Sequence, residues 1–178
     1  DKEKRVALVV DEWGIWTDVE PGTNPGFLYQ QNSLRDALIA GTTLNIFNNH
    51  ADRVKMANLA QTVNVLQSMV LTKGKEMLLT PTYYVFDLYT NHMEGKLIPI
   101  DFTTPDYVNG NSKIPAVNAS ASLDSTGKVH ITFVNIDANK DITINAGLKG
   151  KTYKTVTGRI LTSEKFTDIN TFENKTQV

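Results

Sequence analysis

The chain has 178 residues, of which 40% are hydrophobic and 21% are charged, and these fractions are ordinary for a globular protein. Its formal net charge is −1 and it has no long basic run, so nothing in it favours binding to a nucleic-acid backbone. No apolar stretch approaches the roughly 18 residues that span a membrane, and the lack of cysteine excludes disulfides, cysteine-ligated zinc and thiol nucleophiles.

The first element is an apolar run at residues 6–10, which ends at the acidic pair Asp11 and Glu12 and at two tryptophans, Trp13 and Trp16. Such a run is typical of a fully buried strand in a parallel sheet that is covered on both faces. In an α/β barrel, catalytic groups lie at the C-terminal tips of the strands, which is the position of this acidic pair. A neighbouring tryptophan offers a flat apolar surface on which a sugar ring can stack. The alternative is that the acidic pair ends the strand in solvent and the tryptophans fill the core.

A loop and a helix are expected next. Residues 17–26 contain two prolines and two glycines, which indicates a long loop. Residues 29–49 are predicted to be helical, because apolar residues recur there at three- and four-residue steps. Ser33 and Asn32 are the candidate caps, and Gly41 weakens the middle of the helix enough to allow a break. His50 is expected to cap or pack near the helix end, because the three histidines are scattered and lack metal-ligand spacing.

A second strand and a second helix are predicted before residue 93. The strand is expected within residues 54–65, around residues 57–63, although polar residues such as Gln61 interrupt it. Residues 66–80 form an apolar connector with a turn at 73–75. Thr80 then caps a helix that has Pro81 at its first position. The aromatic stripe of this helix is interpreted as a packing surface toward the segments that follow.

From Gly95 onward the helical periodicity stops and short alternating segments begin. Turn-forming clusters separate them, and the one at residues 125–127 is a strong hairpin signal. Residues 129–134 alternate strictly between two sets of side chains, so one face of that strand points to a core. Strands at this spacing predict an antiparallel β-sandwich, with a domain boundary near residue 93. The expected strands are residues 96–102, 116–123, 128–135, 141–145 and 153–161.

The first strand and its tip, taken together with residues 34–38, 49–58 and 60–65, resemble family 51 glycoside hydrolases, which are retaining α-L-arabinofuranosidases. The likeness is strongest over residues 5–92 and continues more loosely to about residue 173. It implies an α+β chain in which residues 1–93 are the last strand–helix units (strands 7 and 8) of a (β/α)8 TIM barrel. Residues 94–178 would then be a jelly-roll-like β-sandwich, covered by a returning loop at residues 169–174. A whole barrel needs on the order of 250 residues, so the resemblance implies a fragment.

The resemblance also assigns roles to three residues. Glu12 matches the catalytic nucleophile of the family, and Trp16 matches a tryptophan that lines the arabinose pocket. Gln61 matches a glutamine that hydrogen-bonds the bound arabinose; the alternative is that Gln61 satisfies buried backbone groups. Gly14 stands where many members of the family have asparagine.

Only half of the catalytic machinery is expected in this chain. A retaining glycosidase needs two carboxyl groups about 5 Å apart, and Asp11 should point to the opposite face of the strand from Glu12. The proton donor of the family lies in an Asn-Glu pair on the fourth barrel strand, and this sequence has no such pair. The remaining glutamates lie in charged, turn or sandwich contexts: Glu3, Glu20, Glu76, Glu94, Glu164 and Glu173.

Two functions from different classes follow. In the first, the chain is the C-terminal portion of an arabinofuranosidase that releases terminal arabinofuranose from arabinan, arabinoxylan or their oligosaccharides, without a metal or organic cofactor, and is inactive by itself. In the second, it is a non-catalytic module that binds carbohydrate or serves as a scaffold. The strand that ends at Glu12 favours the first, because a binding module has no need of it.

An open strand edge also predicts homo-oligomers or a rearranged packing of residues 1–93. The sequence does not indicate the cellular compartment, and a secreted, a periplasmic and a cytoplasmic location are all compatible with it.

Overall fold

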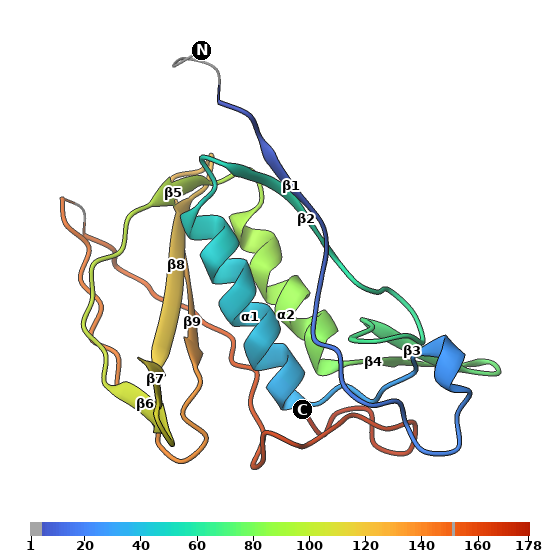
Figure 1. Cartoon of the computed structure of the whole chain (residues 1–178). Helices are drawn as coiled ribbons and strands as arrows, with labels where there is room; N and C mark the ends of the chain where they lie inside the picture. The colour runs from blue at the N-terminus through green and yellow to red at the C-terminus, as the bar shows by residue number, and fades with distance from the viewer. Residues whose placement is uncertain (1–4, 151) are drawn as a thin grey trace.

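The computed structural model describes residues 5–150 and 152–178. Two helices, α1 (Leu34–Asn49) and α2 (Pro81–Tyr89), lie side by side between two sheets (Figure 1). One sheet is the parallel pair β1 (Leu8–Trp13) and β2 (Val54–Leu59), which α1 connects. The other is antiparallel, with the order β5 (Lys96–Ile98), β8 (Val117–Leu123), β9 (Val129–Asn135).

Smaller elements fill the connections. Two antiparallel hairpins project from this body, and two single-turn 3-10 helices lie in the loops. The hairpins are β3 (Val70–Lys73) with β4 (Glu76–Leu79), and β6 (Asp106–Asn109) with β7 (Ser112–Pro115); the 3-10 helices are η1 (Pro25–Phe27) and η2 (Thr90–His92). The β3–β4 turn falls at Gly74, as the sequence predicts.

Local signals place the helix ends well. Ser33 caps α1, and its backbone N–H donates to the Asp36 carboxylate at 2.8 Å, so the helix begins later than residue 29. The break that Gly41 allows does not occur. A Cβ at this position would lie 2.9 Å from Cγ2 of Val134, so glycine lets β9 approach the helix closely. The Thr80 side chain accepts a hydrogen bond from the backbone of α2, as expected of its N-cap.

The core lies between the helices. Leu34, Ala37, Ala40 and Val85 form its centre. The indole of Trp13 packs against it, edge-on to Phe47 and stacked on Phe86, with ring centroids 5.5 and 6.1 Å apart. The aromatic stripe of α2 is therefore a packing surface, as predicted, but it faces both sheets. Phe86 meets β1, and Tyr89 reaches the network at the antiparallel sheet.

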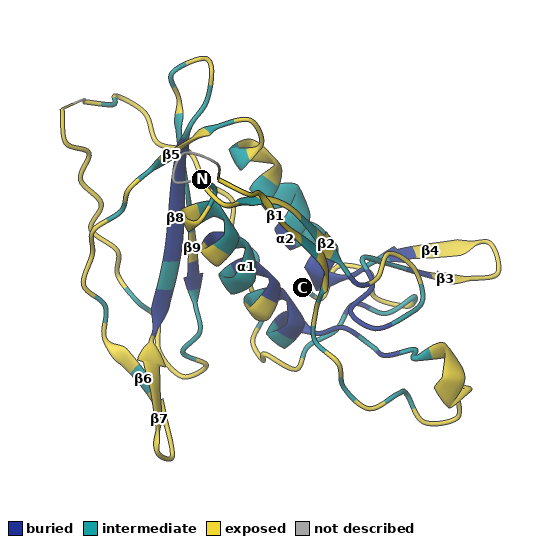
Figure 2. Ribbon diagram, turned by 45° about the horizontal axis from the view of Figure 1, so that its top comes forward, coloured by how far each residue is buried: buried dark blue, intermediate teal, exposed yellow. Residues whose placement is uncertain are grey.

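The prediction of a fully buried first strand is wrong for this chain. The strand runs from Leu8 to Trp13, and Val6, Leu8 and Val9 are 68%, 48% and 44% exposed (Figure 2). Within the described residues β1 pairs only with β2, and helices cover one face of the pair. The apolar run is therefore left open on its other face. The second strand also begins and ends earlier than predicted, at Val54 and Leu59.

The antiparallel part is a small β-rich domain that is consistent with the predicted C-terminal sandwich, and its described sheet is made of β5, β8 and β9. The hairpin at residues 125–127 is confirmed, since β8 and β9 pair along their whole length. Residues 141–145 and 153–161, predicted as strands, join no sheet in the described part of the chain. The layer that faces the sheet is α1, and the tail covers the start of α1 rather than the sheet. Ile169 bridges Ser33 there.

Candidate functional site

The two parallel strands end at one edge of their sheet. Leu59 pairs with Trp13, and the backbone N–H of Ala60 donates to the Trp13 carbonyl at 2.8 Å. Glu12 near the end of β1 and Gln61 just after β2 are thus brought to the same edge, and both are exposed. In open parallel sheets, ligands bind outside the carboxyl ends of the strands. This edge is therefore the candidate site.

The two tryptophans have different environments. Trp13 is part of the core, so for it the core-filling alternative is correct. Trp16 points away from the core and is 69% exposed. Together with Thr17, Asp18 and Val19 it lines an open depression of about 520 Å³. An exposed indole beside an open depression is available for stacking on an apolar sugar face.

Two buried amides support the backbone that leads to Trp16. The Gln67 Oε1 accepts from the Ile15 N–H at 2.5 Å, and its Nε2 donates to the Asp36 carbonyl at 3.1 Å. Gln30 accepts from the Thr17 N–H at 3.1 Å and donates to the Ile15 carbonyl at 3.4 Å. Neither residue could be identified as functional from the sequence. The only available signal was glutamine within or beside otherwise apolar stretches.

Gly14 is tightly enclosed at the end of β1. A Cβ there would lie 2.9 Å from the Ala60 carbonyl oxygen and 3.1 Å from the Gln67 Oε1. Glycine therefore lets the chain leave β1 directly beneath the Ala60 carbonyl. An asparagine, which many members of the resembled family have here, requires the segment after β2 to move.

The three histidines have structural positions away from this edge. His50 is the C-cap of α1, at the opposite end of β2 from Gln61. His92 lies between the hydroxyls of Ser122 and Thr132, at 2.8 and 3.2 Å, and burial lowers its pKa to about 4. His130 bonds Asp124 at 2.8 Å, which holds the pKa of that carboxyl well below its usual range. Among residues 5–150 and 152–178, no group of three or more His, Cys, Asp or Glu side chains could hold a metal ion.

Several of the other glutamates have structural positions. The Glu20 Oε1 accepts from the Gln31 backbone N–H at 3.0 Å, in the loop before α1. Glu76 begins β4 in the projecting hairpin, and Glu3 lies outside the described residues. Glu12, near the end of β1, is the glutamate that lies at the candidate edge.

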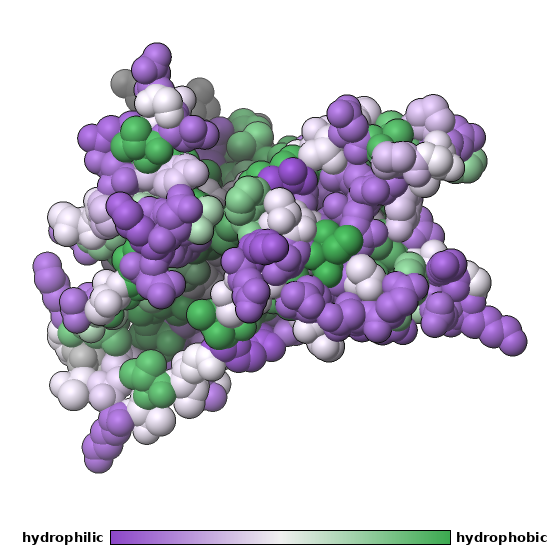
Figure 3. Space-filling model, turned by 90° about the horizontal axis from the view of Figure 1, so that it is seen from below, coloured by the Kyte–Doolittle hydropathy of each residue, from purple (hydrophilic) through white to green (hydrophobic). Residues whose placement is uncertain are grey.

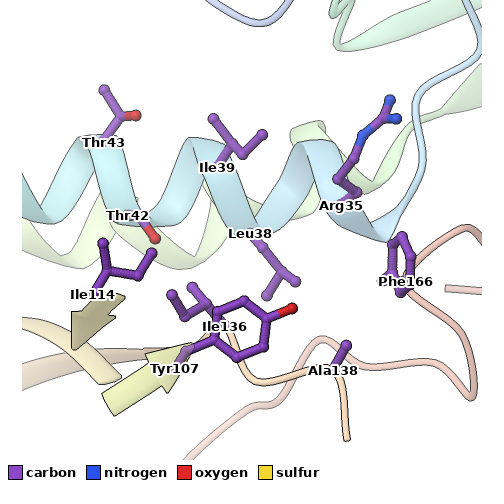
Figure 4. A pocket seen from close by; sticks show the side chains of 10 residues that line it. All are labelled: Arg35, Leu38, Ile39, Thr42, Thr43, Tyr107, Ile114, Ile136, Ala138 and Phe166. Carbon is purple, nitrogen blue, oxygen red and sulfur yellow. The ribbon is translucent and has the colours of Figure 1, made fainter. Parts of the chain in front are cut away.

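A second, apolar pocket of about 340 Å³ lies between α1 and the β6–β7 hairpin. Figure 4 shows Leu38, Tyr107, Ile114 and Ile136 converging on it, while the Arg35 guanidinium points away. From below, apolar side chains lie in a recess bordered by hydrophilic ones (Figure 3). The pocket has no carboxylate in its lining, so it lacks the chemistry of the strand edge.

Among the described residues, no helix has the length and apolar character needed to cross a membrane.

A comparison with known protein families identifies the family of this chain. The model of the alpha-L-arabinofuranosidase C-terminal domain matches residues 11–178. Since this match covers most of the sequence, the chain belongs to that family, and the resemblance inferred from the sequence is confirmed.

Individual relatives agree with this. An intracellular exo-alpha-L-arabinofuranosidase from Bacteroides ovatus is 53% identical over 176 residues, covering 97% of this chain and 34% of that protein. Alpha-L-arabinofuranosidase C from Emericella nidulans is 32% identical over 149 residues, covering 79% of this chain and 29% of that protein. The chain therefore spans about a third of the length of these curated relatives.

Solved structures show the same relation. The GH51 arabinofuranosidase from Xanthomonas axonopodis pv. citri matches with a TM-score of 0.93 at 49% identity, covering 96% of this chain and 34% of that one. The arabinose complex of the Thermotoga maritima alpha-L-arabinofuranosidase matches with a TM-score of 0.76 at 26% identity, covering 97% and 37%. The fold of the described residues is thus that of part of these enzymes.

Proposed function

We propose that this chain supplies the nucleophile half of a retaining α-L-arabinofuranosidase that removes terminal arabinofuranosyl groups from arabinan, arabinoxylan or their oligosaccharides. The observation that carries the proposal is the shared edge of β1 and β2. The hydrogen bond from Ala60 to Trp13 ties the ends of the two strands together, so Glu12 and Gln61 lie at one edge beside the exposed Trp16. The arabinofuranosidase names of the relatives support the substrate class.

The reaction follows from the two-carboxyl mechanism of retaining glycosidases. A Glu12 oxygen attacks the anomeric carbon while the bond to the leaving oxygen breaks, and that oxygen takes a proton from an acid outside this chain. Water then attacks the glycosyl ester, gives its proton to the same residue and frees Glu12. In this scheme Trp16 stacks on the sugar and Gln61 hydrogen-bonds its hydroxyls. The two displacements need no metal or organic cofactor.

The domain division belongs to the same proposal. Residues 1–93 would be the last strand–helix units of a TIM barrel, with β1 and β2 as strands 7 and 8, and residues 94–178 would be a sandwich domain. The parallel β1–α1–β2 arrangement and the uncovered face of β1 support this division. By itself the chain would cover this face by forming homo-oligomers.

The first test is hydrolysis of a chromogenic aryl α-L-arabinofuranoside by the 178-residue chain. We expect no turnover, because the proton donor is lacking. Turnover that Glu12→Ala abolishes would mean that another carboxyl of this chain is the acid, and the half-site account would be wrong.

The second test supplies the missing part. In a chimera, this chain replaces the corresponding third of the Bacteroides ovatus relative, and Glu12→Ala is compared with the matched control Asp11→Asn. We expect the chimera and its Asp11 variant to hydrolyse the substrate, and Glu12→Ala to lose activity by several orders of magnitude. Azide should restore turnover to Glu12→Ala and give a product of inverted anomeric configuration, because the small anion attacks in a single displacement. Full activity of Glu12→Ala would favour the non-catalytic module.

A further inference from the structure

The backbone of Trp16 is held on both sides by one side chain. Its two peptide groups carry the Ile15 carbonyl and the Thr17 N–H, and the Gln30 amide bonds both, at 3.4 and 3.1 Å. A primary amide that accepts from one peptide group and donates to the other imitates a neighbouring strand. Among the described residues no strand pairs with the segment after β1, so Gln30 supplies its pairing.

Gln67 extends this support by one residue. It accepts from the Ile15 N–H, so both polar backbone groups of Ile15 are bonded to buried amides. Its Nε2 bonds the carbonyl of Asp36, a fully buried residue in the first turn of α1. The support is thus anchored at a fully buried position of the helix layer.

The two glutamines differ in burial from the tryptophan whose backbone they support. Gln30 is 1% exposed and Gln67 is fully buried, whereas Trp16 is 69% exposed. Buried amides must find partners, because a buried polar group without a hydrogen bond destabilises the folded state. Satisfying them fixes the backbone of residues 15–17 in one conformation and leaves the indole outside.

We propose that Gln30 and Gln67 are positioning residues that fix the backbone of Trp16 and so hold its indole over the strand edge that carries Glu12. The claim about the backbone stands on the geometry alone, whereas the sugar that Trp16 contacts rests on the proposed function. Neither glutamine is expected to touch the substrate.

The test uses Gln30→Glu as a switch. A neutral carboxylic acid has an acceptor and a donor in nearly the positions of the amide, whereas a carboxylate cannot donate to the Ile15 carbonyl. Burial raises the pKa of such a carboxyl, so acid should restore the pairing and neutral pH should break it. Gln30→Met and Gln67→Met remove the bonds at similar size. Gln31→Met is the matched control, because Gln31 lies in the same loop but donates to the Asn170 carbonyl.

The readout is fluorine NMR of the 178-residue chain labelled with fluorotryptophan. Two signals are expected from its two tryptophans, and Trp16→Phe assigns them. Gln30→Met and Gln67→Met should shift or broaden the Trp16 signal, leave the Trp13 signal unchanged and speed amide exchange of Thr17 or Ile15 about five- to tenfold. In Gln30→Glu the Trp16 signal should return toward its original position as the pH falls. An unchanged Trp16 signal, or equal changes in Gln31→Met, would overturn the proposal.

The chimera separates the two claims. There, Gln30→Met should raise KM several-fold and change kcat less than twofold, with KM recovering in Gln30→Glu at acidic pH relative to the unmutated chimera. A fall in kcat at constant KM would indicate a smaller folded fraction and would contradict the positioning role. A selective change of the Trp16 signal in a chain whose chimera is inactive would support the positioning role and contradict the proposed function.

Discussion

The two faces of the helix layer differ in what they bury. Toward the antiparallel sheet, α1 meets a polar network: the Asn45 Oδ1 accepts from the hydroxyls of Tyr89, Ser120 and Thr132 at 2.8, 2.7 and 2.7 Å. We call this set the Asn45 network. Toward the parallel pair, the helices meet the aromatic side chain of Trp13, and apolar side chains of the pair such as Val9 and Met56 remain 44% and 51% exposed.

The two sheets therefore differ in which side chains they bury. The antiparallel sheet buries polar side chains against α1, whereas apolar side chains of the parallel pair remain exposed. In β9, the row with Thr132 and Val134 packs on α1, and the more apolar row with Phe133 lies on the other face, where Phe133 is 38% exposed. The stability of the described chain should therefore depend on the Asn45 network and little on the outer face of β1.

Replacing Asn45 should have the largest effect. Asn45→Leu removes an acceptor that the hydroxyls of Tyr89, Ser120 and Thr132 share, and we expect the free energy of unfolding to fall by about 2 to 3 kcal/mol. Urea unfolding followed by circular dichroism measures this change. Asn48→Ala is the control, because it removes one bond to Ser120 and should cost about 1 kcal/mol. Equal effects of both variants would contradict a central role for Asn45.

Gly41→Ala should be the next largest. The added methyl meets Val134 at 2.9 Å, and overpacking of this kind costs about 1–3 kcal/mol, against a gain of up to about 1 kcal/mol in helix propensity. We expect net destabilisation in the same unfolding assay. In a Val134→Ala background the clash is relieved, so Gly41→Ala should become neutral or stabilising there. A stabilising effect in the unmutated chain would show that β9 does not pack this closely.

The contribution of His92 should appear as a pH dependence. Burial lowers its pKa from 6.5 to about 4, with the nearby His130 adding to the effect. Below pH 6.5 the unfolded chain binds this proton while the folded chain does not, so stability is fully present above 6.5 and is lost as the pH falls toward 4. Unfolding measured from pH 7.5 to 4 should show this loss. His92→Gln should remove its share, and an unchanged slope would exclude His92 as the source.

The parts of the fold that could be predicted from the sequence are those set by local chemistry. The Ser33 and Thr80 caps and the hairpin turn, in which Asp124 accepts from the Thr126 and Lys128 N–H groups, use residues two to four positions apart. What a strand packs against is not local. The exposure of β1, and the lack of strand pairing by residues 141–145 and 153–161 in the described part of the chain, depend on which neighbours are present, and the periodicity of the sequence does not indicate this.

The candidate site divides in the same way. The resemblance supplied Glu12, Trp16 and Gln61, and their roles stay predictions, although the strand edge groups the positions of Glu12 and Gln61. Gln30 and Gln67 could not be found from the sequence. Each bonds backbone groups 13 to 52 positions away, and a side chain-to-backbone bond leaves no pattern in residue types.

The outer face of β1 should give the smallest change in stability and a clear change in association. Val9 and Met56 are cross-strand partners, so Val9→Thr with Met56→Thr makes one exposed apolar patch polar. Surface changes of this kind usually alter stability by less than about 0.5 kcal/mol, whereas an oligomer held by the patch should weaken. Light scattering across a concentration series measures the mass.

Thermal unfolding at the same concentrations separates the two effects, because association that favours the folded state makes Tm rise with protein concentration. We expect that rise in the unmutated chain and not in the double variant. The matched control is Val108→Thr, which makes a 61% exposed residue on the β6–β7 hairpin polar and should leave both mass and Tm unchanged. An unmutated chain that is monomeric at every concentration would refute self-association through β1. The apolar face of β1 would then be exposed to water in the folded monomer. Packing against the helix layer would be sufficient to stabilise the parallel pair.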